Sequence, residues 1–333
     1  MVIINRIKMN RSVVLAIIAV AIVICSWGCK SKGSNQTHIP KPVAFPYPTE
    51  PTIIGSLEQK NQWMSEHFWD SFFDTTRVYS PDTSFVGGVT KNDFTEAFGR
   101  YAGSLHSVST ASLLKSQAKL ISKTIEAKKR RPGEIIYESI IDINEHFFYD
   151  PNSPYRSDEA YIPILEGLIE SPFEDSLMKE TYSKQLEMCK KNRLGQKAAD
   201  FEFVTSKGKP GSLYGIKAPF IVIFFSNPLC HTCKGTVEML SSRDEVNKML
   251  DDGKLAIVNI FIDEDIQSWL DARNSYPQNW INCHDPEYKI REKKIYSIRA
   301  IPSLYLIDSE KNVVLKDADV EVILQNLIWL SHR

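Results

Sequence analysis

The first hydrophobic pattern along the chain is an uninterrupted apolar run, Val13–Ile24, which follows three basic residues and precedes the polar stretch 30–37. This layout is typical of an export signal. Twelve apolar residues in a helix extend over roughly 18 Å at about 1.5 Å per residue, which is short of the roughly 30 Å hydrocarbon core of a bilayer. The pattern predicts export of the chain rather than a lasting transmembrane helix.

From residue 54 to residue 192, apolar side chains recur at helical spacing, and few segments alternate as strands do. The expected helices are Ser56–Asp74, one that opens at Thr90 and includes Tyr101, Ser109–Arg130, Glu134–Phe148, Asp158–Glu170 and Phe173–Lys191. The first carries an aromatic stripe that we interpret as helical core rather than the wall of a ligand groove: Trp63, Phe68, Trp69, Phe72 and Phe73. No His, Cys or carboxylate cluster in this region has ligand spacing. The pattern predicts an all-α domain without an assigned chemistry.

After residue 194 the pattern changes to short apolar or alternating segments separated by polar turns. The expected strands are Phe220–Phe225, Leu255–Ile262 and a hairpin of Ser303–Ile307 with Val313–Lys316, and the expected helices are Cys233–Leu250, Asp265–Asn274 and Val320–Leu330. Strands that alternate with helices and end in a hairpin predict an α/β domain, in which a mixed central sheet has helices on both faces.

The composition of the 333 residues agrees with two globular domains, since 43% are apolar and 24% are charged. The 40 Lys and Arg residues are balanced by 41 Asp and Glu, and this balance argues against a nucleic-acid partner. Between the export signal and the helices, five prolines in residues 40–51 predict an extended, unpacked tether. We therefore divide the chain into a signal peptide (1–28), a proline-rich tether (29–53), a helical domain (54–192) and an α/β domain (194–333).

The residues before Cys29 resemble the bacterial lipobox, in which a peptidase cleaves before a cysteine that is then acylated. Gly28 is the small residue expected there, whereas Trp27 is bulky and Ser26 stands where Leu is usual. The resemblance implies a lipid anchor at Cys29, on a membrane and facing the periplasm. An ordinary secretory signal and an uncleaved anchor are the alternatives. Cleavage before Cys29 would remove three positive charges and no negative ones, leaving 305 residues with a net charge near −4.

The candidate chemistry lies in Cys230, His231, Thr232 and Cys233, which follow the predicted strand and open a predicted helix. Free amide groups and the positive end of the helix dipole at a helix N-terminus favour a thiolate. In this geometry Cys230 is the exposed nucleophile, and Cys233, one turn inside, resolves the mixed disulfide. A protonated His231 would further stabilise the Cys230 thiolate and make the disulfide more oxidising.

A metal site and a static disulfide are the alternative uses of these cysteines. A zinc site commonly needs two Cys pairs or a pair with two spaced His, and here His231, Cys283 and His284 accompany a single pair without standard spacing. A static disulfide is the other alternative. For Cys189 and Cys283, we expect buried free thiols, with a bridge between the domains as the alternative.

Three separated motifs, in order, resemble the thioredoxin-like proteins of the TlpA and ResA type. They are Gly195–Phe201 (GQKAADF), the strand that leads into CHTC, and Ile298–Asp308 (IRAIPSLYLID). The resemblance covers residues 194–333 and implies a membrane-tethered thiol-disulfide oxidoreductase that needs no cofactor. It implies that Pro302 is a cis-proline beside the CxxC motif. It also implies exported protein thiols or disulfides as substrates and a membrane electron donor or acceptor as partner. The helical part resembles an uncharacterised domain that precedes thioredoxin-like domains in some bacterial lipoproteins.

The chain departs from these relatives around the cysteine pair. Phe224 stands where thioredoxins commonly bury an Asp, Thr236 where ResA-type proteins commonly have a Glu, and Leu229 in place of the usual Trp. Glu238 lies nearby and is expected on a solvated helix face. These differences leave the dithiol in place and change the groups available to move its protons.

The sequence therefore favours dithiol-disulfide exchange, and the resemblance implies a reductase. A binding module on a thioredoxin-like scaffold and a peroxidase related to the peroxiredoxins, which also resemble the chain at GQKAADF, are the alternatives.

Overall fold

The computed structural model describes residues 41–51 and 54–332. The expected signal peptide, Cys29 and most of the expected tether lie outside these residues. Within them, no helix combines the length and the apolar character needed to cross a membrane.

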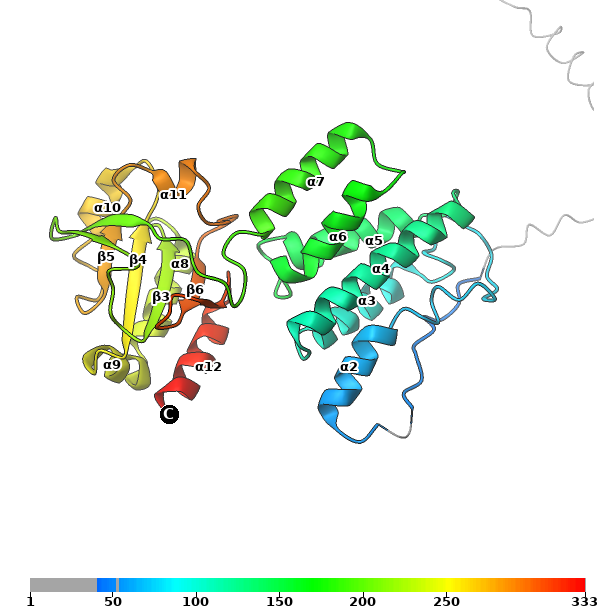
Figure 1. Ribbon diagram of the computed structural model, residues 1–333, viewed down its shortest axis with the longest axis horizontal. Helices are drawn as coiled ribbons and strands as arrows, with labels where there is room; N and C mark the ends of the chain where they lie inside the picture. Colours follow the sequence, from blue (N-terminus) through cyan, green and yellow to red (C-terminus); the bar gives the residue numbers. More distant parts are fainter. Residues whose placement is uncertain (1–40, 52–53, 333) are drawn as a thin grey trace, which may run out of the picture. The chain divides into compact units, whose positions relative to one another are not determined.

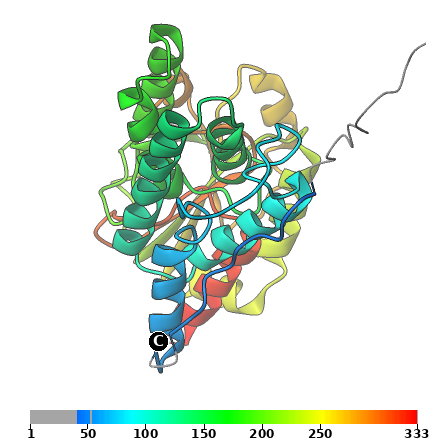
Figure 2. The same ribbon diagram turned by 90° about the vertical axis from the view of Figure 1, so that its right-hand side faces the viewer.

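The helical domain consists of α-helices joined by loops, of which the longest covers residues 68–90 between the first two helices (Figure 1, Figure 2). They are α2 (Leu57–His67), α3 (Lys91–Leu105), α4 (Thr110–Arg130), α5 (Ile136–Asn144) with a π-helical turn (Glu145–Tyr149), α6 (Asp158–Glu170) and α7 (Ser176–Cys189). Side-chain caps fix several of their starts: Ser56 and Gln59 form a capping box on α2, and Thr90 accepts the N–H of Asp93 on α3. The prediction of an all-α region before the sheet is confirmed.

Four of the five residues of the predicted aromatic stripe belong to the core of this domain, whereas Trp63 is partly exposed and stacks on His67 at a ring-centroid distance of 4.9 Å. Phe68, Trp69, Phe72 and Phe73 are each less than 9% exposed. Regular helix nevertheless ends at His67 rather than at Asp74, because these four side chains all turn inward and residues 68–73 form successive turns instead of one helical face.

The prediction that the proline-rich segment stays unpacked is wrong at Phe45. The segment is extended, but Phe45 is only 6% exposed and its ring stacks on Phe72 at a centroid distance of 5.5 Å. Val43 also donates its N–H to the carbonyl of Gly88 at 2.8 Å. A large aromatic residue gains more from burial against other rings than a polar linker does, so this part of the segment is held in the helical core.

The C-terminal region contains a seven-stranded mixed sheet with the order β2-β1-β5-β4-β3-β6-β7. Its strands are β1 (Glu202–Thr205), β2 (Pro210–Ser212), β3 (Phe220–Ser226), β4 (Leu255–Phe261), β5 (Ile281–His284), β6 (Ser303–Ile307) and β7 (Val313–Leu315). Strands β3, β4 and β5 are parallel, whereas β1, β2, β6 and β7 join the sheet through antiparallel pairs. The predicted mixed sheet is confirmed.

The central strand β3 alternates between the two faces of the sheet. Val222 and Phe224 pack in one core with α8 (His231–Ser241), α9 (Asp244–Asp251) and α12 (Val320–Ser331). Ile221, Ile223 and Phe225 pack on the other face, which includes Ile290 of α11 (Lys289–Glu292) and the segment around Ala198. Near the carboxyl end of β4, Phe261 packs on Trp269 of α10 (Ile266–Ala272).

Two details differ from the sequence prediction. The expected helix 233–250 is two helices, because the chain breaks at Ser242 and Arg243, where the Asn247 side chain donates to the carbonyl of Ser241 at 2.9 Å. The strand β5 was not expected. It has only four residues, and its pairing with β4 is a tertiary contact that its own sequence does not specify.

Candidate active site

The two cysteines lie where β3 passes into α8. Cys230 is the N-cap of α8 in extended conformation, and its Sγ accepts the N–H of Cys233 at 3.1 Å. Cys233 is one turn inside and 2% exposed, whereas Cys230 is partly exposed. Both are free thiols in the structure. The arrangement presents one thiol to a partner molecule and keeps the other behind it, within the same helical turn.

The surroundings of Cys233 are apolar on the side of the sheet. Phe224, at the position where thioredoxins commonly have an Asp, is fully buried in the same cluster as Cys233. Burial, followed by the hydrogen bond with Cys230, raises the pKa of the Cys233 thiol to about 12. Cys233 therefore holds its proton at neutral pH, and its attack on a mixed disulfide requires a group that takes this proton.

Polar groups that no sequence motif indicated also lie beside Cys233. A cavity beside the thiol is lined by Asn227, Lys234, Asp271 and Tyr276, among others. Asn227 donates its side-chain amide to Asp263 at 2.5 Å. This opening gives the buried thiol a polar outlet that Phe224 does not provide.

Three polar side chains from neighbouring strands of the sheet form hydrogen bonds with one another. Ser226 of β3 donates to the side chain of Asn259 of β4, which donates to Asn282 of β5 at 3.1 Å. All three residues are buried. The signal in the sequence was Asn259 inside the apolar run of its strand, because a buried amide needs partners on neighbouring strands.

The remaining residues of the CxxC segment are exposed. His231 and Thr232 lie in the first turn of α8 with exposed side chains, as does Glu238 further along the helix. Thr236, at the position where ResA-type proteins commonly have a Glu, is buried and donates its hydroxyl to the carbonyl of Thr232 at 3.1 Å. Glu238 is exposed and Thr236 has no carboxylate, so neither residue replaces the Glu of ResA-type proteins beside Cys233.

The strand pairing brings Pro302 to the cysteines. Because β6 pairs with β3 so that Ser303 lies opposite Phe225, residues 300–302, which we call the proline loop, lie next to the CxxC segment. The Cys230 thiol donates to the carbonyl oxygen of Ile301 at 3.8 Å. The Ile301–Pro302 peptide bond is cis, the geometry that the resemblance implies.

The other two described cysteines lie in hydrophobic clusters that contain neither Cys230 nor Cys233. Cys189 is buried in the helical core, and Cys283 is buried under the sheet in a different cluster. Both are free, so the bridge considered as an alternative does not form. Burial raises the pKa of each thiol well above its ordinary value. Within 41–51 and 54–332, no three His, Cys, Asp or Glu side chains are arranged to hold a metal ion.

Comparison with known proteins finds relatives for both regions. Residues 25–192 match the family described as a domain of unknown function, DUF5106. No curated protein matches the chain. A thioredoxin-like protein from Bacteroides caccae is similar over 86% of this chain and 98% of its own, with 33% identity and a TM-score of 0.73.

Two further solved structures match only part of this chain. The C-terminal domain of an uncharacterized protein from Bacteroides fragilis is 38% identical, covers 41% of this chain and 98% of its own, and has a TM-score of 0.40. The thioredoxin domain of a thiol-disulfide oxidoreductase from Bacteroides vulgatus is 19% identical, covers 40% of this chain and 98% of its own, and has a TM-score of 0.36. The similarity to the Bacteroides caccae protein, which covers 86% of this chain, agrees with the mixed sheet and the helical region described above. The chain is a thioredoxin-like protein and belongs to the DUF5106 family.

Proposed function

We propose that this protein is a thiol-disulfide oxidoreductase of the cell envelope that reduces disulfides of exported proteins. The observation that carries the proposal is the pair at the start of α8, where a partly exposed Cys230 accepts the N–H of a buried Cys233 at 3.1 Å. The amide groups and dipole of the helix N-terminus stabilise negative charge on Cys230. The resemblance to the TlpA and ResA type supports the same reaction.

The reaction proceeds in two exchanges. The Cys230 thiolate attacks one sulfur of the substrate disulfide, forms a mixed disulfide and releases the other substrate sulfur as a thiolate, which takes a proton. Cys233 then loses its proton, attacks the Sγ of Cys230 and releases the second substrate thiol. The substrate gains two electrons and two protons, and the protein leaves with a Cys230–Cys233 disulfide. A membrane electron donor returns it to the dithiol.

Anchoring completes the proposal. We infer that Cys29 carries lipid and that residues 42–333 face the periplasm. Growth with radiolabelled palmitate tests this: label on the wild type that is lost in Cys29→Ala supports the anchor, and equal label on both proteins rules it out.

Insulin reduction with dithiothreitol as the electron source tests the exchange reaction. The wild type should accelerate insulin precipitation, Cys230→Ser should not, and Cys233→Ser should accumulate a mixed disulfide with the substrate. Cys283→Ala is the matched control, because its thiol is buried under the sheet away from the pair, and it should retain activity. An inactive wild type would favour the binding module.

A further inference from the structure

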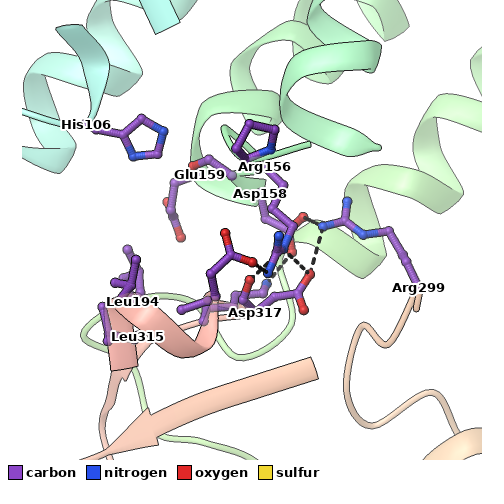
Figure 3. Close-up of a pocket in the computed structure, with 14 residues that line it drawn as sticks. His106, Arg156, Asp158, Glu159, Leu194, Arg299, Leu315 and Asp317 are labelled. Carbon is purple, nitrogen blue, oxygen red and sulfur yellow. Dashed lines mark hydrogen bonds and ion pairs between the residues drawn. The ribbon is translucent and has the colours of Figure 1, made fainter. Parts of the chain in front are cut away.

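Four buried charged side chains join the helical domain to the thioredoxin-like domain (Figure 3). Both domains lie in one compact unit, residues 42–333. Asp158, in the first turn of α6, lies 3.0 Å from the guanidinium of Arg299 and 2.8 Å from the ammonium of Lys316. Arg299 also lies 3.4 Å from the carboxylate of Asp317. The side chains of all four are at most 13% exposed.

The cluster has the features of a fixed junction. A buried charge is tolerated only when opposite charges and hydrogen bonds surround it, and here Asp158 meets two cations while Arg299 meets two carboxylates. Burial alone would lower the pKa of Arg299, but Asp158 and Asp317 raise it overall. Removal of the Asp158 charge would leave the buried Lys316 ammonium without its carboxylate.

A second interaction from the helical domain holds the same arginine. The guanidinium of Arg299 lies 4.6 Å from the centroid of the Tyr149 ring, a cation–π contact. The position of Arg299 is therefore determined by side chains from another domain, Asp158 and Tyr149, as well as by Asp317 of its own.

Arg299 and Asp317 bracket the proline loop. Arg299 immediately precedes residues 300–302, and Ser303, which immediately follows them, donates its hydroxyl to Asp317 at 2.7 Å. Ser303 is fully buried. Within the loop, the carbonyl oxygen of Ile301 faces the Cys230 thiol at 3.8 Å. A continuous set of contacts thus leads from Asp158 of α6 through Arg299 to the backbone beside the reactive sulfur.

We propose that the helical domain positions the proline loop for the docking of protein substrates, and that Asp158 is the positioning residue that does so through Arg299. This inference rests on the proposed oxidoreductase function. A protein disulfide must place its own backbone beside the loop while its sulfur meets Cys230, so an error in the position of the loop weakens docking. The exchange between sulfurs, once they meet, depends on Cys230 and Cys233. The loss of Asp158 therefore acts on KM rather than on kcat.

The test is steady-state reduction of insulin by the full chain carrying Asp158→Asn, which removes the charge and keeps the shape of the side chain. The KM for insulin should rise about tenfold while kcat changes less than about twofold. The reduction potential of the cysteine pair should not change. Glu166→Gln is the matched control, because it removes an ion pair of the same helix, with Lys190 at 2.7 Å, in which both side chains are more than 40% exposed. It should change neither constant.

A second variant separates positioning from folding. Arg299→Lys keeps the positive charge but removes the Nη2 atom that lies 3.0 Å from Asp158 and 3.4 Å from Asp317, so it should raise the KM by less than Asp158→Asn does. An unchanged KM in a folded Asp158→Asn protein would overturn the proposal, and so would an equal loss through kcat. If Asp158→Asn does not fold, a wild-type KM in Arg299→Lys would overturn it. An inactive wild type would instead refute the proposed function.

Discussion

Gly167 of α6 lies at the close contact between α6 and α4, and its replacement by Ala tests the packing of the helix that carries Asp158. A Cβ atom at residue 167 would lie 2.6 Å from Cγ1 and 2.8 Å from Cγ2 of Ile121. Both distances are below ordinary van der Waals contact. Ile121 is 3% exposed and β-branched, and such a side chain has one strongly preferred rotamer in a helix, so it cannot turn away.

Two opposing contributions decide the size of the effect. Ala is more favourable than Gly in a helix by about 1 kcal/mol. Overpacking of a filled core costs about 1–3 kcal/mol. Because the new Cβ would meet two carbons of a rigid branched side chain, we expect a cost near the upper end of this range. We therefore expect Gly167→Ala to lower the free energy of unfolding by about 2 kcal/mol.

Urea unfolding followed by far-UV circular dichroism measures this change. Gly103→Ala in α3 is the matched control, because no atom lies within 4 Å of the Cβ position there. It should raise the free energy of unfolding by up to about 1 kcal/mol. Ile121→Ala removes both clashing carbons, so the double variant with Gly167→Ala should be more stable than the sum of the two single effects. Equal stabilisation by Gly167→Ala and Gly103→Ala would refute the close contact.

The remaining predictions concern the site and the helical core. Iodoacetamide at pH 8 should label Cys230 in the reduced native protein and leave Cys233 unlabelled, because a pKa of about 12 keeps the Cys233 thiol protonated. Equal labelling of the two cysteines, quantified by mass spectrometry, would contradict this. Labelling of Cys233 should increase only as the pH approaches that value. Gln117→Leu should lower the free energy of unfolding, measured in urea, by about 3 kcal/mol. The reason is that the buried Gln117 accepts from the Tyr101 hydroxyl at 3.0 Å and donates to Asn144 at 2.9 Å. A loss below about 1 kcal/mol would show that Tyr101 and Asn144 find other hydrogen-bond partners.

Local patterns predicted the elements that local interactions determine. The helix Asp158–Glu170 was predicted with the bounds that the structure has, because its apolar spacing and its start after Ser157 are both visible in the sequence. The placement of Cys230 at a helix start followed in the same way from the strand that precedes it.

The features that were missed depend on contacts between distant residues. Phe45 is buried only because the aromatic cluster of the helical core accepts it, and its proline-rich surroundings indicated a solvated segment. Nothing in the local sequence of Asp158 or of Arg299 shows that the two side chains will lie 3.0 Å apart. The cavity beside Cys233 likewise requires the start of α8 to meet α10 and the residues that follow α10.

The reduction potential of the Cys230–Cys233 pair tests the central claim most directly. It is measured by equilibration of the protein in glutathione or dithiothreitol buffers, with the disulfide quantified on the peptide that contains both cysteines. We predict a single two-electron transition near −270 mV, as expected for a reductase of thioredoxin type. A potential near −120 mV, the range of a strong oxidant, or the failure of the two cysteines to form a disulfide with each other would contradict it.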